Sequence, residues 1–328
     1  MRSPDGKNST FSAQPYAHMK IGIIDLGSNT FNLLIAEIDD RGGYKPLYRS
    51  KVGVKLGEGG FERNYITEAA MERAFVALQA QLAAIQNQYC DRVLAFATSA
   101  IRSASNGAQF VEKVKETLGI TIHIISGDRE AEMIYHGVQL SGSLSQEAQL
   151  VMDIGGGSTE FIICNEDEIF WKRSYELGVS RLLEKFNPED PISPETIARV
   201  ESFLDVQLVD MYKASAEWKV KGLIGSSGSF DTFSDLLSMR KGDYEIQLEQ
   251  PSWPLEKAAL RSELDTLIRS TRHQREMMPG MLPLRVNMIV LSALFVRLMF
   301  KHLPFESARL SRYSLKEGVL FDVLKGNL

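Results

Sequence analysis

Two glycine-rich turns carry the residues of this chain whose types and spacing could do chemistry. The segments IIDLGSNTFNLLI (residues 23–35) and VMDIGGGSTEFII (residues 151–163) align without a gap. Asp25 aligns with Asp153, and in each copy an apolar run ends in this acid and continues into small residues. A single turn of this kind is a common structural feature. Two matching copies with matching apolar flanks indicate a shared chemical task.

The chemistry that these residue types suit is phosphate binding. Glycine lets backbone N–H groups approach phosphoryl oxygens closely, and hydroxyl side chains add donors. Asp25 and Asp153 each end a predicted strand and could hold a hydrated Mg²⁺ that also touches the phosphates. Neither turn is a Walker P-loop, because no Gly-Lys-Ser/Thr follows. The residues expected to contact phosphate in the two turns are Gly27, Ser28, Asn29, Thr30, Gly155, Gly156, Gly157, Ser158 and Thr159.

A third glycine turn, IGSSGSFDTF, has the pattern of a strand, a turn and a helix. Gly225, Ser226, Ser227 and Gly228 would offer N–H groups at a helix N-terminus, which is a ready anion site. Taken alone, the segment fits a tight strand-to-helix turn better than a binding site. Beside the other two turns, it is interpreted as a third phosphate contact.

The elements expected to position these turns alternate between strands and helices. Residues 20–38 and 149–178 each begin with a strand, a glycine turn and a second strand. Residues 67–89 have the apolar spacing of a helix, and residues 127–140 are expected to form another. The pattern favours mixed α/β domains built on a related plan.

Composition narrows the class of protein. The chain has 328 residues, 44% of them hydrophobic and 24% charged, with a net charge of −5. That balance is typical of a soluble globular protein and argues against general DNA binding, which depends on a cationic surface. Two cysteines cannot form a disulfide framework, so a reduced, cytoplasmic location is expected. The apolar stretch 288–300 is too short for a membrane span and is interpreted as a buried helix.

Seven segments occur in an order that resembles the exopolyphosphatase/guanosine pentaphosphate phosphohydrolase (Ppx/GppA) family. They are GIIDLGSNTFNLLI, ATSAIRSASN, IISGDREAEMIYHGV, MDIGGGSTEFII, ELGVSRL, IGSSGSFDT and SLKEGVL. The resemblance spans about residues 20–325 and places the chain in the superfamily of actin, Hsp70 and sugar kinases. It implies an α/β fold of two ribonuclease-H-like domains with a cleft between them. The expected divisions are a flexible leader at 1–18, a first domain at 19–138 plus about 310–328, and a second domain at 139–309.

The same resemblance implies hydrolysis of a terminal phosphoanhydride bond with Mg²⁺. Glu130 matches the family's catalytic acid, Arg102 a phosphate-contacting arginine, and Asp153 and Glu160 the acids of the second turn, so the metal ligands are predicted as Asp25, Asp153 and Glu160. A carboxylate is a suitable group to orient a water molecule and take its proton. The substrates implied are inorganic polyphosphate, guanosine pentaphosphate or both. No DNA or membrane partner is expected, and a homodimer is left open.

Two departures from the family pattern bear on the site. Arg129 stands where an acid usually precedes Glu130, which would make the local field more positive. Lys316 replaces a usual arginine and keeps the charge but not bidentate geometry. Two other functions stay open: a kinase or ATPase on the same fold, and a weakly catalytic module that binds guanosine tetra- or pentaphosphate and regulates a partner.

Overall fold

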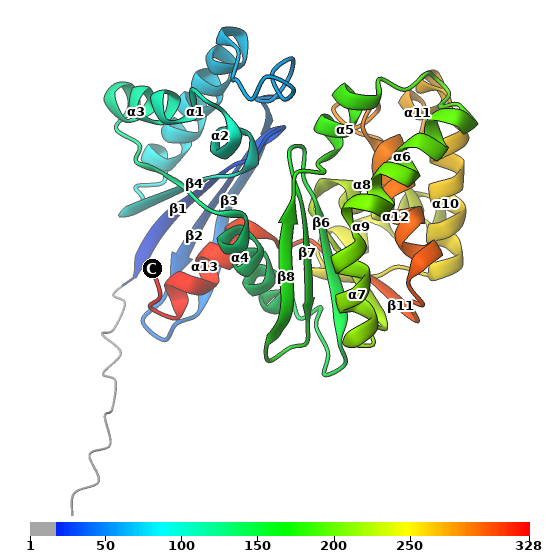
Figure 1. Cartoon of the computed structure of the whole chain (residues 1–328). Coiled ribbons are helices and arrows are strands. Elements are labelled where there is room, and N and C mark those ends of the chain that lie inside the picture. Colours follow the sequence, from blue (N-terminus) through cyan, green and yellow to red (C-terminus); the bar gives the residue numbers. More distant parts are fainter. Residues whose placement is uncertain (1–17) are drawn as a thin grey trace, which may run out of the picture.

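The computed structural model describes residues 18–328, which form two β-sheets with helices on both sides of each (Figure 1). Apart from His18, the expected leader lies outside the described residues. The first sheet has the strand order β3-β2-β1-β4-β5. Its strands are β1 (Met19–Leu26), β2 (Thr30–Ile38), β3 (Tyr44–Gly53), β4 (Arg92–Ala97) and β5 (Ile122–Ile124).

The second sheet repeats the opening of the first. Its order is β10-β11-β9-β6-β7-β8. In both sheets the first hairpin is antiparallel, pairing Asp25 with Asn32 in one and Asp153 with Glu160 in the other. The gapless alignment therefore corresponds to two hairpins with the same register. The strands are β6 (Gln149–Ile154), β7 (Thr159–Cys164), β8 (Ile169–Tyr175), β9 (Gly222–Ser226), β10 (Ser252–Pro254) and β11 (Ser307–Ser311).

The helices form three layers around the two sheets (Figure 1). One outer layer packs on the first sheet and consists of α1 (Glu68–Asn87), α2 (Ser99–Ser103) and α3 (Gly107–Leu118). The other covers the second sheet and includes α5 (Val179–Phe186), α6 (Pro194–Gln207), α7 (Val209–Glu217), α8 (Ser227–Lys241), α10 (Lys257–Arg269) and α12 (Ile289–His302). Two short helices, α9 (Tyr244–Leu248) and α11 (Arg272–Glu276), connect elements of this layer. The middle layer is the pair α4 (Gly127–Leu140) and α13 (Leu315–Leu324), which lies between the sheets.

Burial on both faces explains the continuous apolar runs of the central strands. In β1, Ile23 packs in the core shared with α4 and α13, whereas Ile24 packs in the core under α1 and α3. A strand covered on both faces has no polar face to alternate with. The mixed α/β fold with two sheets is thus confirmed, and residues 288–300 do form a buried helix, α12. Within residues 18–328, no helix has the length and apolar character needed to cross a membrane.

The middle pair of helices is packed backbone to backbone. A Cβ on Gly318 of α13 would lie 1.6 Å from the carbonyl oxygen of Met133, and one on Gly137 of α4 would lie 2.1 Å from that of Ser314. This contact brings the N-terminal ends of α4 and α13 to the same cavity. The domain boundaries expected at residues 138 and about 310 fall inside α4 and β11. The chain leaves α4 after Leu140 and leaves β11 after Ser311. The helices α4 and α13 pack together in a core that both sheets share.

Candidate active site

The two glycine turns close in the same way. The amide of Gly27 donates to the carbonyl of Thr30 at 3.1 Å, and the amide of Gly155 donates to that of Ser158 at 3.0 Å. A Cβ on Gly27 would lie 2.9 Å from the Thr30 oxygen, and a Cβ on Gly155 would lie 2.9 Å from the Ser158 oxygen. Both positions therefore need glycine for the turn itself.

The turns also touch each other across the space between the sheets. A Cβ on Gly156 would lie 2.5 Å from Asn29 Nδ2, and one on Gly157 would lie 2.5 Å from Ser28 Oγ. Ser180 of α5 donates a 2.7 Å hydrogen bond to Asn29 Oδ1. The run of three glycines thus lets the second turn pack against the first, in addition to exposing its amides.

A cavity of about 110 Å³ lies where the turns, α4, α8 and α13 meet. It brings together most of the predicted site residues from segments far apart in the chain. Those lining it are Asp25, Gly27, Ser28, Asn29, Thr30, Glu130, Asp153, Gly155, Gly156, Gly157, Ser158, Glu160, Ser227 and Gly228.

Four predicted phosphate contacts lie beside the cavity instead of on it. Thr159 Oγ1 donates to the carbonyl of Leu177, and Ser226 Oγ donates to that of Tyr313. Gly225 belongs to β9, where a Cβ would collide with the ring of Phe230. The fourth residue, Arg102, bonds Glu130. In the structure these four residues pack against, or form hydrogen bonds with, other parts of the protein. The turn patterns alone do not reveal these contacts.

Glu130 lies in the first turn of α4, which Ser126 caps. Its carboxylate accepts a 2.7 Å hydrogen bond from Arg102 Nη1, and the same nitrogen bonds the carbonyl of Ile125 at 3.1 Å. Only 6% of Glu130 is exposed. Burial raises the pKa of Glu130 to about 7, and the Arg102 guanidinium opposes this rise. The structure therefore makes Arg102 the partner of a buried carboxyl group poised to exchange a proton near neutral pH.

Arg129 points away from the cavity, contrary to the expected effect on the local field. Its guanidinium bonds Asp322 of α13 at 2.7 Å and Glu132 at 3.1 Å. His136 also lies 2.8 Å from Asp322. Arg129 pairs with Glu132 and Asp322 and thereby ties α4 to α13, and it does not line the cavity.

The three predicted metal ligands are each held by a neighbouring side chain. Asn32 donates to Asp25 at 2.9 Å, Ser314 to Asp153 at 2.6 Å and Ser174 to Glu160 at 2.7 Å. In residues 18–328, no group of three acidic, histidine or cysteine side chains forms a ready-made metal site. Mg²⁺ commonly binds one or two carboxylates and completes its shell with water and substrate oxygens. The buried Asp153 and the partly buried Asp25, which line the same cavity, fit that donor set.

Four cations line the same cavity, and the sequence analysis singled out Lys316 alone among them. Lys51 lies on β3, Arg285 precedes α12, and Arg312 follows β11. Lys51 and Arg312 pair with acids of α8, at 3.9 Å from Asp231 and 3.1 Å from Asp235. No sequence motif surrounds these residues, so only the fold reveals them.

Arg285 differs from the other three cations. It is 6% exposed, and within the described part of the chain no carboxylate lies within 4 Å of its guanidinium. A Cβ on Gly228 would lie 1.8 Å from Arg285 Nη2, so the guanidinium rests on the N-terminus of α8. Ser227 begins that helix with a φ of 68°, which costs a non-glycine residue about 1–2 kcal/mol. An unpaired buried cation at a helix N-terminus is an environment that favours an anion.

The raised pKa of Glu130 predicts a pH dependence of stability in metal-free protein. A carboxyl group with a folded-state pKa near 7 binds more protons in the folded than in the unfolded state, so stability falls as pH rises from about 4.5 to 7. Replacing Glu130 with Gln removes this loss. The Tm of Glu130→Gln minus that of the wild type should therefore grow from pH 5 to pH 7 and then level off. Calorimetry at several pH values checks this.

The matched control is Glu132→Gln on the same helix. Burial raises the pKa of Glu132, but hydrogen bonds from Lys172 and Arg129 outweigh burial and lower it, so the Tm difference for Glu132→Gln should stay nearly constant from pH 5 to pH 7. A Tm difference for Glu130→Gln that stays constant with pH would contradict the assigned environment of that carboxyl group.

The fold and the cavity define a class of protein: two related α/β sheets whose facing glycine turns line one cavity, the fold of actin-like proteins. Within that class, the Ppx/GppA phosphatase family model matches residues 34–327. The chain therefore belongs to the Ppx/GppA phosphatase family.

Solved structures of relatives show the same fold. An exopolyphosphatase from Cytophaga hutchinsonii is 37% identical, with a TM-score of 0.91 over 94% of this chain and 98% of its own. The Ppx/GppA member from Aquifex aeolicus is 25% identical, with a TM-score of 0.76 over 95% of this chain and 100% of its own.

Two curated relatives have different names. Guanosine-5'-triphosphate,3'-diphosphate pyrophosphatase from Pseudoalteromonas translucida is 28% identical over 305 residues. Exopolyphosphatase 1 from Mycobacterium bovis is 25% identical over 302 residues. The matches cover 92% of this chain in both cases, but 59% of the first relative and 87% of the second.

Proposed function

We propose that this protein hydrolyses the terminal phosphoanhydride bond of inorganic polyphosphate, of guanosine pentaphosphate, or of both. The observation that carries the proposal is the position of Glu130. A buried carboxyl group with a pKa near 7 faces the same small cavity as two glycine turns and four cations. Relatives named for each substrate support the reaction class.

The cavity residues have separate roles in the proposed reaction. The amides of the glycine turns hold the terminal phosphate, and Glu130 orients a water molecule. The water oxygen forms a bond to phosphorus, the bond from phosphorus to the bridging oxygen breaks, and the water proton passes to Glu130. Cationic side chains of the cavity other than Arg285 stabilise the oxygen that leaves. Bound Mg²⁺ would supply further charge neutralisation at the phosphoryl oxygens. Positioning and charge account for most acceleration in phosphoryl transfer.

A phosphate-release assay tests the proposal directly. Purified protein with Mg²⁺ is given polyphosphates of several chain lengths and guanosine pentaphosphate side by side. We expect orthophosphate from at least one of them, released from the chain end. Tight binding of guanosine pentaphosphate without release would instead identify a regulatory module. Turnover of ATP far above both substrates would indicate an ATPase or kinase.

The proposed metal ligation gives a separate prediction. Mg²⁺ should raise the Tm of the wild type, because it relieves the repulsion between Asp153 and the carboxylates of Asp25 and Glu160. Asp153→Asn should lose most of this rise. The control is Asp167→Asn, which changes an exposed acid in the β7–β8 turn. An equal Mg²⁺-induced rise in Asp153→Asn and the control would contradict the assignment of Asp153.

A further inference from the structure

The segment between α11 and α12 carries Arg285 into the cavity, although residues 279–288 form neither helix nor strand. Local turns fold the segment, with the amide of Arg285 donating to the carbonyl of Leu282 at 2.8 Å. Such turns do not by themselves fix where the segment lies relative to the second sheet. A contact from outside the segment is needed to hold Arg285 against α8.

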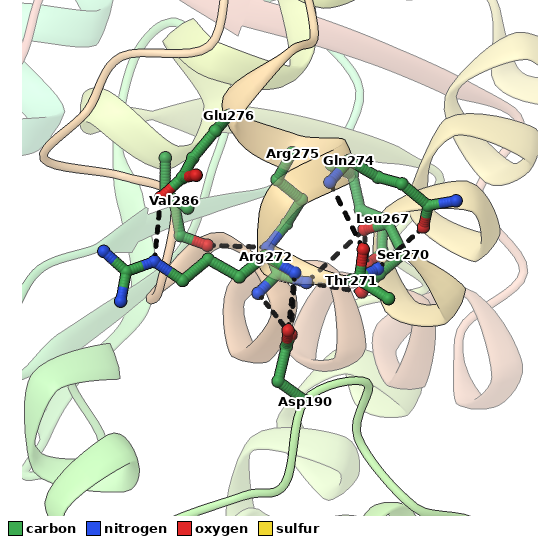
Figure 2. Close-up of polar contacts among 9 residues, drawn as sticks. All are labelled: Asp190, Leu267, Ser270, Thr271, Arg272, Gln274, Arg275, Glu276 and Val286. Carbon is green, nitrogen blue, oxygen red and sulfur yellow. Dashed lines mark hydrogen bonds and ion pairs between the residues drawn. The ribbon is translucent and has the colours of Figure 1, made fainter.

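Besides the packing of Leu284 and Met288, Arg275 makes a polar contact of this kind, because its guanidinium joins three separate segments (Figure 2). Its Nε donates to the carbonyl of Val286 at 2.7 Å, and its Nη1 donates to the carbonyl of Ser270. Its Nη2 donates to Asp190 Oδ1 at 2.9 Å. Arg275 is only 4% exposed. Each nitrogen of the planar group therefore holds a different part of the chain, a pattern that lysine cannot reproduce.

Asp190 completes the arrangement from the loop between α5 and α6. Its carboxylate also accepts the backbone amide of Arg272, at 2.7 and 2.9 Å for its two oxygens. These hydrogen bonds lower the pKa of Asp190 even though burial opposes them. The carboxylate thus orients both the side chain of Arg275 and the first turn of α11, as Figure 2 shows.

The residue held by this arrangement lies directly beside Arg285. Val286 follows Arg285 in the chain, so a bond to the Val286 carbonyl restrains the backbone that carries the cavity cation. The acids that act on Arg285 are Asp231 and Asp153, whereas those that act on Glu130 are Asp25 and Asp153. Arg285 contacts the N-terminus of α8, whereas Glu130 lies in the first turn of α4, so the two side chains enter the cavity from different elements.

We propose that Arg275 and Asp190 are positioning residues that hold Arg285 where it binds a phosphate of the substrate beyond the two that share the scissile bond. The inference rests on the proposed function for the identity of that phosphate. A contact to a phosphate that does not react is made equally in the ground and transition states. Its loss raises KM and leaves kcat nearly unchanged.

Asp190→Asn is the variant of choice, because it keeps the shape of the side chain and removes the charge. We expect its KM for polyphosphate to rise about tenfold, the scale of one weakened charged hydrogen bond, with kcat within about twofold. The matched control is Arg272→Gln on the same helix. The Arg272 side chain pairs with Glu276 at 2.8 Å, outside the three bonds of Arg275.

A double-mutant cycle separates positioning from general loss of structure. In an Arg285→Gln background, Asp190→Asn should raise KM no further, because the group that it positions is gone. Arg275→Lys should behave like Asp190→Asn. Equal KM increases with and without Arg285, or a fall in kcat and Tm with KM unchanged, would overturn the proposal.

Binding without turnover keeps this inference separate from the proposed function. The Kd of inorganic tripolyphosphate is measured by calorimetry in metal-free buffer for the same variants. Asp190→Asn should weaken tripolyphosphate binding about tenfold when Arg285 is present. It should not weaken binding in the Arg285→Gln background. This pattern without phosphate release would support the positioning role and refute hydrolysis. Release with unchanged Kd and KM would support hydrolysis and refute the positioning role.

Discussion

Glu130→Gln is expected to lower the rate of phosphate release by about 10²- to 10⁴-fold, the usual contribution of a positioned general base. Glutamine keeps the size of the side chain and can still accept a hydrogen bond from Arg102, which lies 2.7 Å from the carboxylate. It cannot take a proton from water. KM should change little, because the phosphate is held by the glycine turns and the cations.

Glu132→Gln provides the matched control for this experiment. Glu132 lies on the same helix but pairs with Arg129 and Lys172 outside the cavity. Its replacement should leave the rate within about twofold, since surface ion pairs contribute little. A Glu130→Gln protein that is folded and retains the wild-type rate would refute the assigned role.

Gly318→Ala is expected to destabilise the fold and to reduce activity with it. The added Cβ would lie 1.6 Å from the carbonyl oxygen of Met133, which belongs to the backbone of α4 and cannot rotate away. The two helices must separate, at a cost of about 1–3 kcal/mol or more for an overpacked site. Because α4 carries Glu130 and α13 begins beside Ser314, the separation also displaces two residues of the cavity.

Urea unfolding and phosphate release measured on the same preparation check this prediction. Gly53→Ala is the control, because its Cβ would lie 3.5 Å from Leu284 in ordinary contact. The control should keep both stability and rate. Unchanged stability of Gly318→Ala would contradict the close contact between α4 and α13.

Much of the fold and part of the site could be predicted from the order of residues. The strand–turn–strand units follow from apolar runs broken by glycine, and the bonds that close the turns join residues three positions apart. Local bonds of this kind depend on neighbouring residue types alone. Asp25 and Asp153 occupy the ends of buried strands for the same reason. The two-sheet α/β fold and the Ppx/GppA family were both predicted correctly.

Contacts between distant segments could not be predicted in the same way. The sequence patterns do not distinguish Arg102, which bonds Glu130, from a cation that lines the cavity. Gly225 and Thr159 carry the expected residue types but are used for packing and for a bond to the Leu177 carbonyl. The sequence also does not reveal that Arg129 bonds Asp322 in α13 instead of lining the cavity.

The residue types of the turns therefore predict the kind of chemistry, and the proposal is phosphate binding by amides and metal binding by paired acids. Tertiary structure decided which cations line the cavity. Lys51, Arg285 and Arg312 come from three segments with no common pattern, and they meet because the two sheets pack around α4 and α13. Turn geometry depends on neighbours in the chain, whereas a charge enters a cavity only when packing far along the chain places it there.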